Sequence, residues 1–275
     1  MPAKHRLKLV LVLCLLLSSL LACDVLPGIT ITTGTPTTHD TSSHQSPPAL
    51  NTWIAAGSGV ELRYEHWKSA GNNEDTVVIA RFAVHRMHIS IGYQPHQPLL
   101  LSDWMKQTGA LAVINGGYFD KNNQPTGLLV SDGHVSGSSY DSFGGMLSVD
   151  TGGNISLRSL HQQPYDPANE QLQQATQSSP MLMIDGKRTQ FNANAASQRR
   201  SVVAMDKQRR MLFIVSQMQA FSLDELADLL ASSDLDLQTA LNLDGGASTG
   251  LYVNGRNRQV NIDPLSDLPI VIIVK

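Results

Sequence analysis

Apolar runs separated by short polar segments dominate the chain after about residue 53. Residues 77–84 are mostly apolar and 87–91 alternate strictly, so both are predicted strands, the second with one face in water. Residues 201–205 and 211–215 flank a polar stretch and predict a β-hairpin. The closing segment 269–274 is apolar throughout, which is typical of a central strand.

Two segments have the spacing of amphipathic helices. Ser222 and Glu225 predict a capping box, and leucines and alanine then recur at helical spacing. The other helix is predicted from Ser102 to Gly109, a residue suited to a left-handed C-cap. Strand signals outnumber these helices, and the chain has neither an internal repeat nor a second linker. We therefore predict an α+β fold, a strand-rich, mixed-sheet single domain with a few flanking helices.

The first 22 residues have the pattern of a signal peptide. Lys4, Arg6 and Lys8 precede an apolar run at Leu9–Leu21, which is shorter than the about 20 residues of a membrane-spanning helix. The run ends in Leu-Leu-Ala-Cys, which resembles the lipobox of bacterial lipoproteins and predicts lipidation of Cys23. A short membrane anchor and an ordinary signal peptide are the alternatives.

Residues 23–50 are rich in Thr, Ser and Pro and predict a disordered tether, which leaves 51–275 as the folded domain. We therefore expect a cell-envelope protein, lipid-anchored on the extracytoplasmic side of the membrane. With Cys14 removed and Cys23 lipidated, the domain would contain no thiol. Disulfides, cysteine-ligated zinc and a cysteine nucleophile are then excluded.

Composition excludes several classes of protein. The chain is 41% hydrophobic with a formal net charge of −3, which excludes a disordered chain. It has one long apolar run and no cluster of Lys and Arg, so neither a polytopic membrane protein nor a nucleic-acid partner is expected. His39 and His44 lack ligand spacing and partners, and we predict no metal site and no cofactor.

Two strand-to-glycine junctions are the strongest candidates for chemistry. Residues 112–117 run from an apolar strand into Asn-Gly-Gly, and residues 240–246 run into Asp-Gly-Gly. Glycines permit positive φ and a close approach of the backbone to a ligand, and successive amides can bind an anion. Asn242 and Asp244 alternate with leucines, so both side chains should point to one side. For either junction alone, a simple tight turn is the alternative.

Three further sequence patterns bear on the chemistry of these junctions. Residues 246–250 match the Gly-x-Ser-x-Gly elbow of serine hydrolases, but the last histidine is His161, and the triad order requires one after the serine. Neither Asp120 nor Asp244 is followed by the full ligand pattern of a calcium loop, which argues against such a site. Arg200 directly precedes the predicted strand 201–205, where it could bind a phosphate or carboxylate.

Together these segments resemble the phosphodiester glycosidase family in order and spacing from about Val77 to Val274. The motifs that carry the resemblance are 114–119, 127–133, 179–186, 200–202 and 242–249, of which Asn-Leu-Asp-Gly-Gly is the most specific. The departures are mild. Residues 247–249 read Ala-Ser-Thr where members often have Gly-Ser-Ser or Gly-Ser-Ala, and Ser201 stands where Thr is common.

The resemblance implies hydrolysis of a sugar-1-phosphodiester at its glycosidic C–O bond, which leaves a phosphomonoester. It makes Asp244 the first candidate for the catalytic carboxylate, with Asp120 or Asp132 as a second. A phosphate leaving group needs less protonation than an ordinary glycoside, so a clamp for its charge matters more. The candidate substrate-binding residues are Asn115, Gly117, Arg200, Asn242, Gly245, Gly246, Ser248 and Thr249.

Two other hypotheses remain at this stage. A membrane-tethered phosphoglycan-binding module would keep the pocket without turnover, and a structural envelope lipoprotein would bind no sugar phosphate. The expected partners are a sugar-phosphodiester or phosphoglycan substrate and the membrane, through the lipid on Cys23. Loss of product on changing Asp244 would distinguish the enzyme from the binding module.

Overall fold

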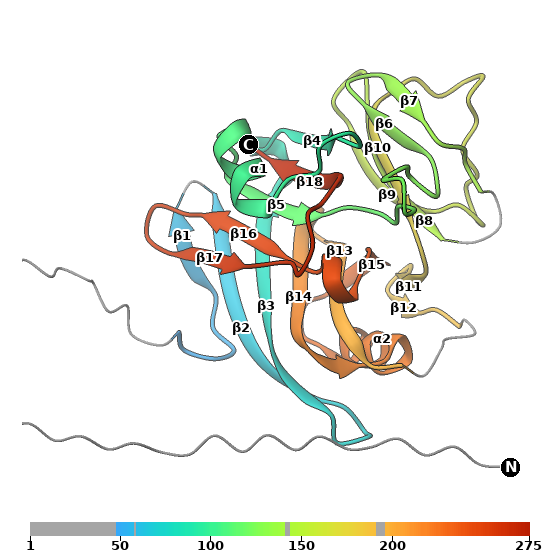
Figure 1. The fold of residues 1–275 in the computed structure, drawn as a ribbon. Coiled ribbons are helices and arrows are strands. Elements are labelled where there is room, and N and C mark those ends of the chain that lie inside the picture. The colour runs from blue at the N-terminus through green and yellow to red at the C-terminus, as the bar shows by residue number, and fades with distance from the viewer. Residues whose placement is uncertain (1–47, 58, 141–143, 191–195) are drawn as a thin grey trace, which may run out of the picture. The chain divides into compact units, whose positions relative to one another are not determined.

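The computed structural model describes residues 48–57, 59–140, 144–190 and 196–275, which form three sheets and two α-helices (Figure 1). The predicted signal peptide, Cys23 and the tether up to residue 47 lie outside these residues. Within the described ranges, no helix is both long and apolar enough to cross a membrane.

The largest sheet has eight strands. Their order is β1 (Ile54–Gly57), β2 (Val60–Lys68), β3 (Glu74–Ala83), β14 (Arg210–Phe221), β13 (Gln198–Asp206), β15 (Leu237–Asn242), β11 (Met181–Ile184) and β12 (Lys187–Arg188). The long hairpins β2–β3 and β13–β14 make up its centre, and the second of them is the hairpin predicted from its two apolar runs.

Two sheets of five strands complete the fold. The second sheet has the order β7 (His134–Ser136), β6 (Leu129–Ser131), β10 (Leu172–Ser178), β8 (Gly145–Asp150) and β9 (Ile155–Ser159). The third has the order β17 (Gln259–Ile262), β16 (Leu251–Asn254), β5 (Ala112–Asn115), β18 (Ile270–Val274) and β4 (Ile89–Tyr93). The helices are α1 (Leu101–Thr108) and α2 (Leu223–Ser232), with 3₁₀ turns at Val84–Arg86 and Gly246–Ser248.

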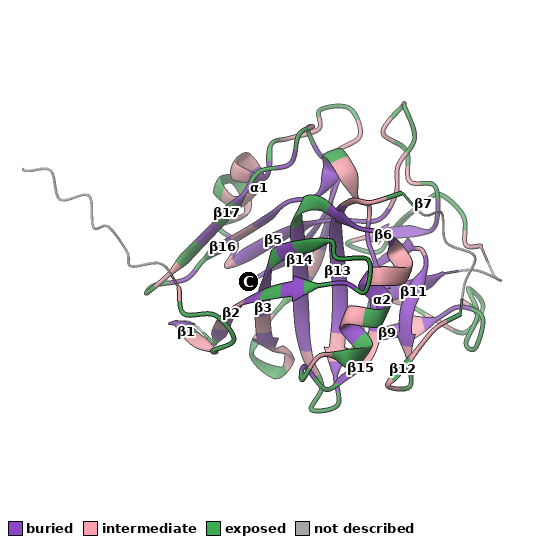
Figure 2. Cartoon of the chain, turned by 90° about the horizontal axis from the view of Figure 1, so that it is seen from below, coloured by how far each residue is buried: buried purple, intermediate pink, exposed green. Residues whose placement is uncertain are grey.

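The main core draws side chains from all three sheets. Phe82 of β3 and Phe213 of β14 meet edge to face with their ring centroids 5.0 Å apart, and Leu147, Ile114 and Ile272 belong to the same cluster. Figure 2 shows this pattern as buried central strands surrounded by exposed loops. This core holds β5, β13 and β15 in place, and the candidate site lies where β5 and β15 end and β13 begins.

The two helices pack on different sheets. Leu226 and Leu230 of α2 pack on the outer face of the eight-stranded sheet, and Trp104 of α1 packs on β5 and β18 of the third sheet. The Trp104 indole also donates a hydrogen bond to the backbone of Leu268, at 2.9 Å. Both helices therefore bury the apolar stripe that their sequences predict.

The strand-rich fold with few flanking helices is confirmed. Ser222 caps α2 in a complete capping box with Glu225, and Gly109 ends α1 at a φ of +61°. The 201–215 hairpin forms, and β18 lies between β5 and β4, so the closing strand is internal.

Two details differ from the sequence prediction. Pairings between the described strands are all antiparallel, with one parallel bridge at Leu50 and Tyr64, whereas mixed sheets were expected. Short hairpin connections explain this for strands that follow one another in the chain, because parallel neighbours need longer crossovers. Pairs such as β3–β14 and β5–β16 join strands far apart in the sequence. The segment 84–86 forms a 3₁₀ turn, and the alternating strand starts only at Ile89, where the chain passes from the first sheet to the third.

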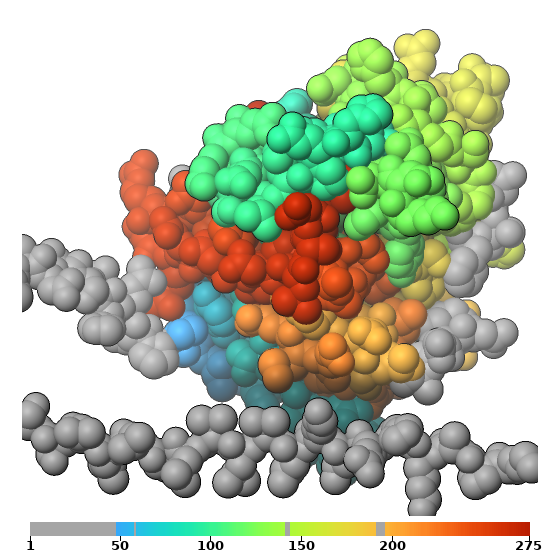
Figure 3. All heavy atoms as spheres, viewed as in Figure 1, coloured from blue at the N-terminus to red at the C-terminus, as the bar shows by residue number. Residues whose placement is uncertain are grey.

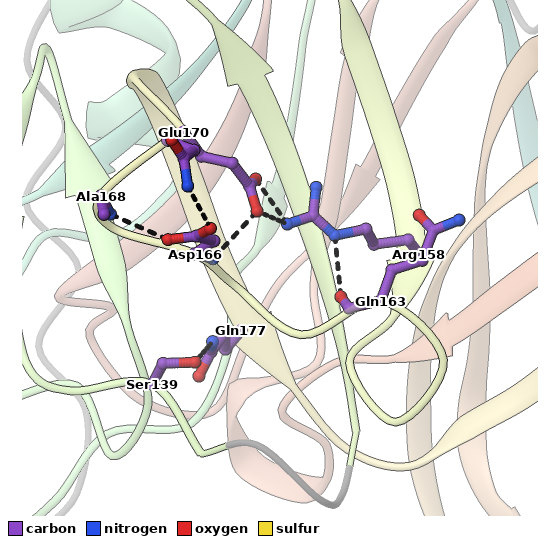
Figure 4. A network of polar contacts seen from close by, with 8 residues as sticks. Ser139, Arg158, Gln163, Asp166, Ala168, Glu170 and Gln177 are labelled. Carbon is purple, nitrogen blue, oxygen red and sulfur yellow. Dashed lines mark hydrogen bonds and ion pairs between the residues drawn. The ribbon is translucent and has the colours of Figure 1, made fainter.

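An ion-pair network closes the long connection between β9 and β10. The Arg158 guanidinium contacts the Glu170 carboxylate and donates to the carbonyl of Gln163 at 3.1 Å (Figure 4). Glu170 also accepts from the backbone N–H of Asp166 at 3.0 Å. These contacts hold the connection beside the small core around Leu160 and Met146.

Glu225 links α2 to the β2–β3 hairpin, and its carboxylate should make the free energy of unfolding depend on pH. Hydrogen bonds from the Ser69 hydroxyl, the backbone N–H of Ser222 and Asn73 lower its pKa to about 2. A depressed carboxyl pKa stabilises the fold above its unfolded pKa, and this contribution is lost as pH falls toward 2. We expect Glu225→Gln to be less stable at neutral pH and to flatten the decline in unfolding free energy between about pH 4.5 and 2. Urea unfolding of both proteins across this pH range measures the difference. If unfolding free energy fell as steeply with pH in Glu225→Gln as in the wild type, Glu225 would not be the group responsible.

Candidate functional site

The two glycine junctions predicted from the sequence lie side by side. The backbone N–H of Asp244 donates to the carbonyl of Gly116 at 3.1 Å, and the next residue back, Leu243, donates to the carbonyl of Ser201 at 2.9 Å. The ends of β5 and β15 therefore meet next to β13. Segments more than 120 residues apart in the sequence form one corner of the molecule.

Asn115 joins these segments through its side chain. Its amide nitrogen donates to the carbonyl of Asp244 at 2.6 Å. Its amide oxygen accepts from the Ser201 hydroxyl at 2.7 Å and from the backbone N–H of Gly250 at 3.2 Å. Asn115 is only 1% exposed, and its amide is engaged by protein at both ends. The structure thus places this predicted substrate-binding residue beneath the site, where it positions the two junctions.

Close packing accounts for the glycines of the first junction. A β-carbon on Gly116 would lie 2.5 Å from Ile270, and one on Gly117 would lie 2.2 Å from the carbonyl of Gln177 in β10. Both distances are too short for a β-carbon, so either the Ile270 side chain or the Gln177 backbone would have to shift. Gly117 was predicted to bind substrate, and here it brings the turn against the second sheet. In the second junction, Gly246 has a φ of +60°, which favours glycine.

Asp244 is half-buried beyond the end of β15. Its carboxylate accepts from the backbone N–H of Gly245 at 2.9 Å and from the Ser248 hydroxyl. Burial raises the pKa of Asp244 above its usual range, although these two hydrogen bonds oppose the shift. A half-buried carboxylate that is costly to ionise is typical of a catalytic acid or base.

Tyr118 is a site residue that the sequence predictions missed. Its hydroxyl donates to the carbonyl of Ser179 at 2.8 Å and accepts from the amide of Asn242, also at 2.8 Å. Burial and the charge of Asp244 raise the pKa of Tyr118 to about 12, although Arg200 and the hydrogen bond from Asn242 oppose the shift. The phenol therefore lies within electrostatic reach of both groups and stays protonated at neutral pH. The sequence signal for Tyr118 was its place in the 114–119 motif, which does not show the contact with Asn242.

Arg200 lies inside β13, which begins at Gln198, rather than before the strand as predicted. Its Nε donates to the carbonyl of Phe221 at 3.0 Å, and its Nη2 donates to that of Ala196 at 2.8 Å. Burial lowers the pKa of Arg200. Among the described residues no atom accepts from Nη1, and a β-carbon on Gly245 would lie 3.8 Å from it. A positioned cation with a free N–H thus stands beside the Asp-Gly-Gly junction.

Asn242 and Thr249 are fully buried residues of the second junction. The Asn242 amide nitrogen donates to Tyr118 and to the carbonyl of Ser179 at 2.9 Å. The Asn242 Oδ1 and the Thr249 hydroxyl are both buried, and no described atom bonds to them. Buried polar atoms without partners are uncommon in folded proteins, and they are often found at functional sites.

The other two predicted carboxylates lie elsewhere. Asp120 is exposed and closes a turn by accepting from the backbone of Asn122 and Gln124, at 2.8 and 2.9 Å. Asp132 is exposed in the β6–β7 turn at a φ of +49° and accepts from the Gln174 amide at 2.7 Å. No contact between described residues joins either carboxylate to Asp244. The described ranges also contain no group of three or more His, Cys, Asp or Glu side chains that could hold a metal ion.

Replacing Tyr118 with phenylalanine tests the phenol. The change removes one hydrogen bond given to Ser179 and one accepted from Asn242, so we expect a stability loss of about 1–2 kcal/mol. Turnover of a bound substrate should fall by roughly tenfold or more, because Asn242 and Asp244 lose a common neighbour. Steady-state kinetics beside urea unfolding checks this. Tyr64→Phe, at another half-buried tyrosine on β2, is the matched control and should keep full activity.

The fold and parts of the sequence match known proteins. A sequence model described as "Phosphodiester glycosidase" matches residues 108–274. The chain is 29% identical over 169 residues to the uncharacterized Escherichia coli protein YigE, covering 57% of this chain and 63% of that protein, so it spans less than two thirds of the relative's length.

Solved structures share the fold. One is the zebrafish N-acetylglucosamine-1-phosphodiester alpha-N-acetylglucosaminidase catalytic domain, auto-inhibited by its pro-peptide. It has a TM-score of 0.60 at 17% identity and covers 81% of this chain and 86% of its own. A hypothetical protein from Synechocystis has a TM-score of 0.62 at 15% identity, over 83% of this chain and 64% of its own. At these identities the likeness shows the fold alone.

Proposed function

This chain belongs to the phosphodiester glycosidase family, and on that premise we propose that it hydrolyses the glycosidic bond of a sugar-1-phosphodiester. The observation that carries the proposal is the cluster of Asp244, Tyr118 and Arg200 where β5 and β15 end and β13 begins. One carboxylate with a raised pKa, one neutral phenol and one cation with a free N–H are brought together there.

Each group has a role in the proposed reaction. Arg200 Nη1 and the adjacent Gly245–Gly246 backbone bind the phosphodiester, whose negative charge matches the guanidinium. Asp244 accepts a proton from water or stabilises positive charge that develops at the anomeric carbon. Water adds to that carbon, the C–O bond to phosphate breaks, and the products are a free sugar and a phosphomonoester. Tyr118 donates to a sugar or phosphate oxygen when its bond to Ser179 exchanges.

The predicted leader and tether set the expected location. We propose that the domain works outside the cytoplasmic membrane, on phosphoglycans or other envelope polymers that carry sugar-1-phosphodiesters. Support comes only from the sequence of residues 1–50, with its apolar run and Cys23.

The test is hydrolysis in oxygen-18 water with a panel of sugar-1-phosphodiesters, including one of N-acetylglucosamine. Cleavage of the glycosidic bond puts the label on the sugar, whereas phosphodiesterase chemistry at phosphorus puts it on the phosphate. Label in phosphate would contradict the proposal. Binding by calorimetry without any product would favour the phosphoglycan-binding module instead.

A further inference from the structure

A groove lies away from Asp244, between α1 and the β16–β17 hairpin. It encloses about 410 Å³. This volume falls within the range of roughly 300–1,000 Å³ that is typical of small-molecule sites. In Figure 3 the α1 region in green lies directly against the β16–β17 region in red.

The register of the hairpin places four side chains on one face of this ribbon. Tyr252 pairs with Asn261, and Asn254 pairs with Gln259. Residues two apart in a strand point to the same side, so the tyrosine and three carboxamides form one continuous surface. All four line the groove, and the three carboxamide residues are exposed.

Much of the hydrogen-bonding capacity of this surface is unused by protein. The Gln259 amide nitrogen donates to Asn254 Oδ1 at 3.1 Å. No described residue bonds to the Asn254 amide nitrogen, the Gln259 amide oxygen or either end of the Asn261 amide. The Tyr252 hydroxyl donates to Asp263 at 2.6 Å, which anchors the ring at one end of the groove.

The groove is nearly free of net charge. Of the described residues that line it, Lys106 alone is charged, and its ammonium lies 3.0 Å from the Asp103 carboxylate one turn earlier in α1. The Asp263 carboxylate also lies at one end of the groove, against the Tyr252 hydroxyl, so an anionic ligand gains little here. Paired donors and acceptors of carboxamides match neighbouring hydroxyl groups, and the face of an aromatic ring matches the C–H face of a pyranose.

We propose that this groove binds a neutral oligosaccharide. The inference goes beyond the proposed hydrolysis and does not depend on it. A second open groove lies over β8 and β9, and its lining differs from that of the proposed oligosaccharide groove. It has a similar volume of about 430 Å³, but it has no aromatic lining residue and carries Asp150, Arg158 and Glu170.

The experiment is calorimetric titration of the full chain with tetrasaccharides of glucose, mannose and N-acetylglucosamine, and with tetragalacturonate as an anionic probe. We expect the wild type to bind at least one neutral tetramer in preference to the anionic one. Tyr252→Ala and Asn261→Ala should each weaken that binding by roughly tenfold or more. Tyr252→Phe should retain most of it, because the ring is kept.

Two controls distinguish oligosaccharide binding in this groove from hydrolysis at the candidate site around Asp244. Gln171→Ala removes an exposed carboxamide from the groove over β8 and β9, and it should bind like the wild type. Asn261→Ala should hydrolyse a small sugar-1-phosphodiester at the wild-type rate. Absence of binding to all neutral tetramers, preference for tetragalacturonate, or binding unchanged in both groove variants would each overturn the inference. Saturation-transfer NMR of Tyr252→Phe adds a structural readout, because sugar C–H protons should receive saturation from the ring.

Discussion

Replacing Asp244 with asparagine is expected to lower turnover of a sugar-1-phosphodiester by about 10²–10⁴-fold without weakening the fold. Asparagine keeps an oxygen that can accept from Gly245 and Ser248, but it cannot take a proton or carry negative charge. Initial rates with purified wild type and variant, at saturating substrate, measure the change.

The same substitution has a predicted effect on stability, with a definite sign. Because burial raises the pKa of Asp244, the folded protein retains this proton at pH values where the unfolded chain has released it. Wild-type stability is therefore lost as pH rises from the unfolded pKa through the folded pKa. The asparagine variant removes that cost and should be at least as stable as the wild type at pH 7. A large loss of stability would mean that lost activity reports unfolding rather than chemistry.

Two matched controls accompany this prediction. Asp120→Asn and Asp132→Asn neutralise exposed carboxylates that close turns, and both should keep near-wild-type turnover. If Asp244→Asn retained full activity while either control lost it, the catalytic carboxylate would have to be reassigned.

Replacing Asn115 with alanine should cause a large loss of stability, about 2–4 kcal/mol. The change removes the partner of Ser201, Gly250 and the Asp244 carbonyl together, and it leaves a cavity at a position that is 1% exposed. The two glycine junctions would lose the side chain that ties them together. A shift of the urea midpoint at constant slope measures this cost.

The matched control for Asn115 is Asn122→Ala, an exposed loop asparagine, which should change stability by less than about 0.5 kcal/mol. If Asn115→Ala were as stable as this control but bound substrate poorly, Asn115 would act on the ligand directly, as the sequence first suggested.

Local chemistry made several features predictable. The capping box at Ser222, the left-handed Gly109 and the β13–β14 hairpin each depend on residues close together in the chain, and all three form as expected. The apolar closing strand likewise predicted an internal position, because a strand buried on both faces tolerates few polar side chains.

The sequence showed which segments form the candidate site, but it did not show which residues bind a ligand and which pack the protein. Asn-Gly-Gly and Asp-Gly-Gly marked the two junctions, but the same residue types serve both ligand binding and packing. Only the contacts show that Gly117 lies against the carbonyl of Gln177, whereas Gly245 lies both against the carbonyl of Arg199 and beside the Arg200 guanidinium. Tyr118 was missed because nothing local shows that Asn242, more than 120 residues later, bonds to its hydroxyl.

The sequence alone therefore determined the strand-rich class, the helix ends and the identity of the junctions, because hydrophobic periodicity and caps act over a few residues. The tertiary structure decided which polar side chains meet. Antiparallel pairing of β13 with β15 and of β16 with β5 brings Arg200, Asp244 and Tyr118 to one corner and leaves Asp120 and Asp132 in separate turns. The pKa of Asp244 depends on that corner as well, since desolvation by surrounding chain segments has no counterpart in the linear sequence.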